Sequence, residues 1–143
     1  MQLNADQIQR ILPQSYPFVM IDRVVDFQKG ESLTAVKNIT GNEWIFEGQA
    51  CQTGVFPETL LIEAAAQAAI LFYRLNKEEQ SPKSKIFLGR AKAEFFKLVH
   101  IGDQLKLKTA SHKMLATSGY MDIHASVNEA DVANFEIMYS VIK

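Results

Sequence analysis

The chain has 143 residues, of which 48% are hydrophobic and 22% are charged, with a formal net charge of -1 at pH 7. This length fits a single domain, residues 1–143, with a proper core. The near-neutral balance gives no basic footprint for nucleic acid. No apolar run reaches the roughly 20 residues that cross a bilayer, and the polar N-terminus does not resemble a signal peptide. We therefore expect a cytoplasmic protein.

The first part of the chain predicts one short helix and two strands. Asn4 to Ile11 has an amphipathic pattern, with Asn4 as the N-cap. Phe18 to Phe27 is rich in Val, Ile and Phe, which is typical of a strand. Ser32 to Ile39 alternates well enough for a second strand, and Gly41 to Phe56 is mostly loop.

A long helix follows that is apolar almost all the way round. We expect it to start near Pro57, because proline suits the first turn of a helix. Ala, Leu and Ile dominate from Leu60 to Leu71, and a helix that is apolar on every side is normally buried. The polar stretch Asn76 to Lys85 ends it, with Pro82 as the stop.

The rest of the chain is a series of β-type runs separated by turns. The runs are Lys85 to Arg90, Lys92 to Val99, Gln104 to Leu115, Ser118 to Asn128 and Asp131 to Ile142. Two strands, one long helix and then a run of strands are typical of an α+β fold with an antiparallel sheet. A single apolar helix beside one large sheet predicts that the sheet curls around it, which is the hotdog fold.

Three polar side chains lie along one face of the long helix. Thr59, Glu63 and Gln67 are spaced i, i+4 and i+8. A buried carboxylate needs a partner or a function, because burying the ionised form alone is expensive. In one interpretation, Glu63 and Gln67 bond each other or a loop backbone and fix the helix. In the other, this face lines a pocket with Glu63 as general base or acid; the two can coexist.

The start of the helix offers a second chemical feature. Its unpaired backbone N–H groups and partial positive charge can hold a carbonyl oxygen that develops negative charge. Glu58 stands in the first turn and would compete with an anion there. This end therefore suits a neutral carbonyl better than a phosphate.

Motifs of one family are spread over nearly the whole chain. Ile11 to Arg23 (ILPQSYPFVMIDR) is similar to a family pattern LPHRYPFLLVDR, and the segments register without a gap from Lys37 to Ala69. The likeness resumes at Phe87 to Phe95 and at Gly102 to Leu105. On these segments the chain resembles the 3-hydroxyacyl-acyl-carrier-protein dehydratases of the hotdog superfamily. The resemblance implies a hotdog dimer whose composite sites bind an acyl chain carried on phosphopantetheine.

The chain departs from that family in its catalytic loop. The family pattern is G-H-F-P-G-x-P-x-x-P-G, whereas residues 48–58 read GQACQTGVFPE. Gln49 replaces the histidine that is the family's general base, and Glu58 replaces the glycine whose N–H faces the thioester. Gln14 stands where the N-terminal pattern has another histidine. The helix carboxylate is kept as Glu63, together with the glutamine one turn later.

The missing histidine matters for the chemistry. Dehydration of a 3-hydroxyacyl thioester needs a base for the C2 proton and an acid for the leaving hydroxyl. A glutamine amide is no base near neutral pH, and losing a positioned acid–base group costs about 10²–10⁴ in rate. We expect His100, His112 and His124, which lie outside this loop, to be surface or strand residues. The chain alone therefore lacks the base of the usual mechanism.

Three functions remain open. In the first, the chain is a divergent dehydratase subunit that supplies Glu63 to a composite site with a histidine-bearing partner. In the second, it is a thioesterase in which Glu63 activates water or attacks the thioester and Gln49 orients the reactants. In the third, it binds acyl carriers without catalysis, with Arg90, Lys92 and Lys97 as a basic rim. Whole-chain similarity puts the first ahead.

The expected site and its ligands follow from these alternatives. The partners expected are an acyl-carrier-protein-bound acyl thioester and a second hotdog chain, in a homodimer or a heterodimer. The sequence has no metal-ligand spacing and no nucleotide-binding glycine loop, so we expect no metal and no cofactor. Around the catalytic Glu63 and Gln49, the expected substrate-binding residues are Gly48, Phe56, Glu58, Thr59 and Gln67.

Overall fold

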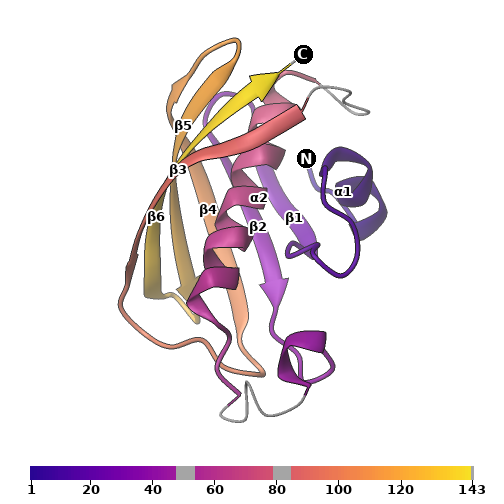
Figure 1. The fold of residues 1–143 in the computed structure, drawn as a ribbon, viewed down its shortest axis with the longest axis vertical. Helices are drawn as coiled ribbons and strands as arrows, with labels where there is room; N and C mark the ends of the chain where they lie inside the picture. Colours follow the sequence, from indigo (N-terminus) through magenta and orange to yellow (C-terminus); the bar gives the residue numbers. More distant parts are fainter. Residues whose placement is uncertain (48–53, 79–84, 143) are drawn as a thin grey trace.

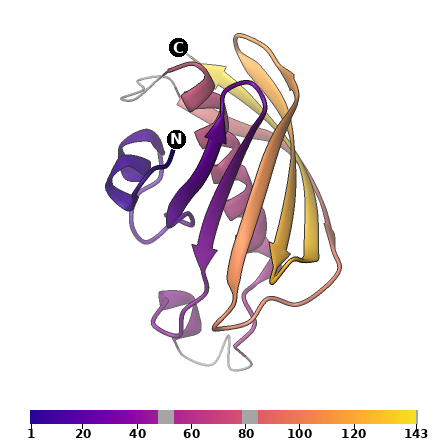
Figure 2. The same ribbon diagram turned by 180° about the vertical axis from the view of Figure 1, so that it is seen from behind.

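The protein folds as one curved antiparallel sheet around a helix (Figures 1 and 2). The computed structural model describes residues 1–47, 54–78 and 85–142. Its six strands lie in the order β1-β2-β4-β5-β6-β3, and all neighbouring pairs are antiparallel. The strands are β1 (Arg23–Gln28), β2 (Ser32–Asn38), β3 (Lys85–Phe95), β4 (Gln104–Met114), β5 (Ser118–Val127) and β6 (Ala130–Ile142).

Helix α2 (Glu58–Asn76) lies across the sheet and packs on β2 to β6, while α1 (Ala5–Ile11) lies beside β1 (Figure 1). Nearly every α2 side chain from Leu61 to Leu75 is buried, as its apolar composition predicts. Strands β4 to β6 alternate buried and exposed residues, since one sheet face covers the helix. The α+β hotdog prediction is confirmed.

Two strand predictions were wrong in their bounds. β1 begins at Arg23 rather than Phe18, because the backbones of Phe18 and Met20 bond the side chain of Gln67 on α2 instead of a neighbouring strand. The runs expected at residues 85–90 and 92–99 form one strand, β3, which ends at Phe95 and has a bulge near Gly89.

The helix boundaries match the sequence more closely. Asn4 caps α1, and a reciprocal hydrogen bond with Gln7 completes a capping box. Pro57 is the residue before the first turn of α2, so the helix starts one position later than a proline in the first turn would place it.

The chain enters α2 through a short paired segment. The N–H of Phe56 donates to the carbonyl of Val99 at 2.7 Å, and that of Ile101 to the carbonyl of Gly54 at 2.9 Å. Gly54 has a φ of 70°, in the left-handed region that favours glycine. The start of α2 is therefore fixed against the connection between β3 and β4.

Strand β3 leaves one edge of the sheet open. Nearly all its side chains are exposed or partly exposed. Large apolar side chains lie exposed along it and just beyond its end, namely Phe87, Leu88, Phe95, Phe96 and Leu98. An edge with unpaired backbone groups and apolar side chains is a template for another chain.

Candidate functional site

Glu63, in the second turn of α2, lies at the wall of an open cavity of about 550 Å³. The segment that follows α1 forms the opposite wall. The lining mixes apolar and polar side chains, and consists of Pro13, Gln14, Ser15, Tyr16, Phe18, Thr59, Leu60 and Glu63. Glu63 therefore lies at an open hollow that has both polar and apolar side chains in its wall.

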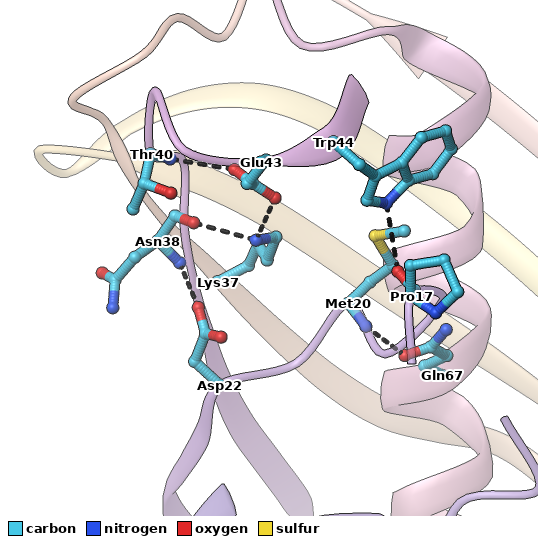
Figure 3. Close-up of polar contacts among 9 residues, drawn as sticks. All are labelled: Pro17, Met20, Asp22, Lys37, Asn38, Thr40, Glu43, Trp44 and Gln67. Atoms are coloured by element: carbon cyan, nitrogen blue, oxygen red, sulfur yellow. Dashed lines mark hydrogen bonds and ion pairs between the residues drawn. The ribbon is translucent and has the colours of Figure 1, made fainter. Parts of the chain in front are cut away.

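Gln67 connects Glu63 to the segment after α1. Its side chain is fully buried, and its Nε2 donates to Glu63 Oε1 at 2.9 Å and to the carbonyl of Phe18 at 2.5 Å. Its Oε1 accepts from the N–H of Met20 at 2.7 Å (Figure 3). The structural interpretation of the polar face is therefore confirmed: Glu63 and Gln67 bond each other and fix the helix.

A second amide reaches the same carboxylate oxygen. Gln14 Nε2 donates to Glu63 Oε1 at 3.3 Å. Glu63 Oε1 thus accepts two amide hydrogen bonds, whereas Oε2 accepts none from the residues that the structure describes. The carboxylate is therefore held through one of its two oxygens.

Of the expected substrate-binding residues, some line this cavity and others do not. Thr59 lines it and is exposed. Glu58, also exposed, and Phe56, which is 1% exposed in the core, are not among its lining residues. Gly48 and Gln49 lie outside the described residues.

The three histidines do not line the cavity. His124 alternates with buried residues on β5, so it lies on the sheet face away from α2, where its Nδ1 is 2.6 Å from Asn134 Oδ1. His112 is exposed on β4, with Nδ1 3.1 Å from Asp122 Oδ2, and His100 is exposed in the β3–β4 connection. Within residues 1–47, 54–78 and 85–142, no group of three acidic, His or Cys side chains could hold a metal ion.

A buried ion pair lies between β2 and the 3₁₀ helix η1 (Trp44–Phe46). Lys37 Nζ is 2.6 Å from Glu43 Oε1 and also donates to the carbonyl of Asn38 at 2.9 Å (Figure 3). Glu43 Oε2 accepts from the N–H of Thr40 at 2.8 Å, and Lys37 Nζ lies 5.9 Å from the centre of the Phe56 ring. Lys37 therefore joins the residues before and after segment 48–53.

Sequence reasoning assigned no role to Lys37 or to the amide of Gln14. A lysine among the apolar residues of a strand, six positions before a glutamate, was the available signal for the ion pair. Gln14 was recognised only as a departure from the family pattern, because its contact with Glu63 joins residues 49 positions apart.

Trp44 connects η1 to the segment after α1 that forms one wall of the cavity. Its Nε1 donates to the carbonyl of Pro17 at 3.1 Å (Figure 3), and its ring meets that of Phe18 edge-on with centroids 5.6 Å apart. The segment after α1 is thus held by α2 on one side and by η1 on the other.

Fold and site together define a hotdog protein with a carboxylate on its central helix. Residues 12–136 match the FabA-like domain. The chain is 36% identical over 141 residues to the 3-hydroxyacyl-[acyl-carrier-protein] dehydratase FabZ of Clostridium botulinum (strain Okra / Type B1), covering 99% of this chain and 97% of that protein. FabZ of Shewanella woodyi is 39% identical over 141 residues, covering 96% and 93%. The chain belongs to the FabA-like family of FabZ-type dehydratases.

A solved structure agrees with the fold. The dehydratase heterocomplex ApeI:P from Xenorhabdus doucetiae superposes with a TM-score of 0.82 at 16% identity, covering 96% of this chain and 91% of that one. In the described part of the chain, no helix is long and apolar enough to cross a membrane.

Proposed function

We propose that this protein acts on acyl-carrier-protein-bound acyl thioesters as a divergent dehydratase subunit, supplying Glu63 to a site completed by a histidine-bearing hotdog partner. One observation carries the proposal: Glu63 is fixed at a cavity wall with Oε2 unoccupied, yet no histidine of the described residues lines that cavity. Membership of the FabZ-type family supports the substrate class.

The reaction assigns a distinct task to each subunit. The partner's histidine takes the C2 proton of the 3-hydroxyacyl thioester, and the C–O bond at C3 breaks. Glu63 gives a proton to the departing oxygen, so the products are a 2-enoyl thioester and water. Oε2 is the oxygen that carries this proton, because Oε1 already accepts two amide hydrogen bonds.

The partner is expected at the open edge of the sheet. Exposed apolar side chains along β3 support pairing with another hotdog chain there. A homodimer would bring two Glu63 sites together, whereas a heterodimer would also bring the histidine.

The test coexpresses this chain with hotdog dehydratase subunits that carry the loop histidine. Mass spectrometry then follows water loss from 3-hydroxyacyl thioesters, by this chain alone and by the copurified complex. We expect water loss to rise by about 10²–10⁴ on pairing, the usual contribution of a positioned acid–base group. Glu63→Gln should remove that increase. No increase with any such subunit would count against the proposal.

A thioesterase is the second candidate. The free Oε2 of Glu63 favours it, because an ionised carboxylate beside a cavity can activate water without another subunit. Gln49 would orient the water or the carbonyl, and the N–H groups at the start of α2 would stabilise the oxyanion. Release of free acid by this chain alone, abolished by Glu63→Gln, would establish this activity. With neither product, and with binding of acyl carriers retained, the chain would be a non-catalytic carrier-binding protein.

A further inference from the structure

Another cavity lies at the opposite end of α2 from Glu63. Its volume is about 640 Å³, and its lining comes from the N-terminal segment, α1, β1, the turn after β1 and the end of α2. It shares no lining residue with the cavity at Glu63. Leu75, which lines it, follows Glu63 by twelve positions, about 18 Å along a helix.

The floor of this cavity is apolar. Leu3, Ile11, Phe27 and Leu75 line it and are each only 4–8% exposed, so they belong to the core while part of their surface meets the cavity. Leu3 is held by backbone pairing with Val24, whose N–H donates to its carbonyl at 3.1 Å and whose carbonyl accepts from its N–H at 3.0 Å. The floor is therefore fixed by the fold.

The rim carries exposed charges. Arg10, Lys29 and Glu78 all line the cavity and are exposed. Lys29 Nζ is 2.7 Å from Glu78 Oε1, so these two charges offset each other. Arg10 forms no ion pair with any described residue. Since a guanidinium stays charged at neutral pH and its planar N–H groups match a carboxylate, the rim offers one positive charge to an anion.

We propose that this cavity binds the anion of an aliphatic carboxylic acid, with the chain on the apolar floor and the carboxylate at Arg10. Small-ligand sites combine apolar lining with a few polar groups in roughly 300–1,000 Å³, and this cavity lies within that range. A strongly polar anion such as a nucleotide would leave the floor without a partner. A neutral hydrocarbon would leave the charge of Arg10 unused.

The proposed site is independent of the acyl-thioester function proposed above. It contains neither Glu63 nor any other residue of that cavity. It lies beside β1, whereas the partner is expected at β3, and these two strands are the opposite edges of the sheet. Pairing of another chain with β3 therefore does not use the strand that lines this cavity.

The experiment follows backbone amide signals by NMR while octanoate, hexanoate or octan-1-ol is added to the whole chain. Signals of Gln7, Arg10 and Lys29 report on this cavity, and signals of Thr59 and Leu60 report separately on the cavity at Glu63. At the first set, octanoate should bind about fivefold more tightly than octan-1-ol, the upper value for an exposed ion pair. Hexanoate should bind more weakly than octanoate, by up to about fourfold for each missing CH₂.

Three variants test the role of the charge. Arg10→Gln removes it and should bind octanoate no more tightly than octan-1-ol, while the affinity for octan-1-ol shows that the cavity is retained. Arg10→Lys keeps the charge and should keep most of the preference. Arg23→Gln removes the same charge from an exposed position of β1 that does not line the cavity, and should bind as wild type does.

The outcomes decide between a built site and none. Saturable shifts at Gln7, Arg10 and Lys29, with a preference for octanoate that Arg10→Gln removes, support the proposal. Shifts confined to Thr59 and Leu60, no shifts at all, or equal affinity of wild-type protein for octanoate and octan-1-ol would overturn it. So would a preference that survives Arg10→Gln. None of these results bears on the role of Glu63, so the two proposals fail separately.

Discussion

Gln67 determines the geometry of the site as much as Glu63 does. It links the carboxylate on α2 to the backbone at Phe18 and Met20. Glu63 could be identified from the sequence because a carboxylate stands out in an apolar helix, and the spacing of Gln67 placed it on the same side. Their partners could not, since the contacts with residues 14–20 join positions 47 to 49 apart.

Replacing Gln67 should destabilise the segment after α1, which Gln67 bonds at Phe18 and Met20. We expect Gln67→Met to lower the free energy of unfolding by about 1–3 kcal/mol, because the N–H of Met20 and the carbonyl of Phe18 lose their partner. Urea denaturation monitored by circular dichroism measures the change. Gln9→Met, at an exposed position, should leave the midpoint unchanged. An unaltered midpoint in Gln67→Met would show that water or the backbone replaces the amide.

Tyr139 is a buried phenol on β6 whose hydroxyl has no hydrogen-bond partner among the described residues. Burial, followed by the neighbouring Tyr73, raises the pKa of Tyr139 far above its usual value. The folded state therefore keeps the proton that the unfolded state releases near pH 10. Its contribution to stability is complete below that pH and is lost as the pH rises further.

Tyr139→Phe tests this linkage. At pH 7 we expect the variant to be as stable as wild type or up to about 1 kcal/mol more stable, because an unsatisfied hydroxyl is removed. Above pH 10 its advantage should grow, since its unfolded state gains nothing from ionisation at this position. Denaturation curves between pH 7 and pH 11 measure the difference. A gap that stays constant with pH would contradict the linkage.

Among the helices and strands, the sequence predicts the bounds most closely where the alternation of buried and exposed residues has a single cause. β4 to β6 each cover α2 with one face, so their alternation is regular and their bounds came close. Phe18 and Met20 lie in a run of strand composition but bond a helix side chain, and nothing local reveals that. The single strand β3, which bulges near Gly89, was predicted as two runs.

The pairing of β5 with β6 depends on a glycine. A Cβ at Gly119 would lie 2.2 Å from the hydroxyl oxygen and 2.3 Å from the Cζ of Tyr139. We expect Gly119→Ala to destabilise the protein by about 1–3 kcal/mol through overpacking. Thermal denaturation measures the loss.

Second substitutions identify the cause of that loss. Tyr139→Leu in the Gly119→Ala background should recover much of the stability, because it removes the ring. Tyr139→Phe should recover little, since the ring carbons stay in place. Equal recovery by both would place the strain elsewhere.

The ion pair between β2 and the turn before η1 should be costly to break from one side. Lys37→Met leaves the Glu43 carboxylate largely buried, with side-chain exposure of 17%. We expect a loss of about 3 kcal/mol, the lower end for a buried pair whose partner remains. Chemical denaturation measures it. The double variant Lys37→Met/Glu43→Leu removes both charges and should be more stable than the single one; the opposite order would refute this account.

At the scale of the whole molecule, the open edge at β3 predicts assembly. Phe87 is 49% exposed on this strand, and its replacement by a charged residue should oppose pairing. We expect Phe87→Glu to reduce the mass measured by light scattering from that of a dimer to that of one chain. Lys108→Glu, an exposed position on the interior strand β4, should leave the mass unchanged. A dimer that persists in Phe87→Glu would place the interface elsewhere.

The FabZ-type family could be identified from the sequence, because its motifs are spread along the chain. How the site is completed stays a prediction, because the sequence shows only that the family's loop histidine is replaced by Gln49. The amides that hold Glu63, from Gln14 and Gln67, belong to this chain. The base of the proposed reaction belongs to a second subunit, whose residues this sequence does not contain.

The two contacts on either side of residues 48–53 have a consequence for mutation. Lys37 and Glu43 hold the chain before this segment, and the pairing of Gly54 with Ile101 holds it afterwards. The groups that make these two contacts all belong to residues outside 48–53. A substitution at Gln49, the expected catalytic position in the segment, therefore replaces none of them.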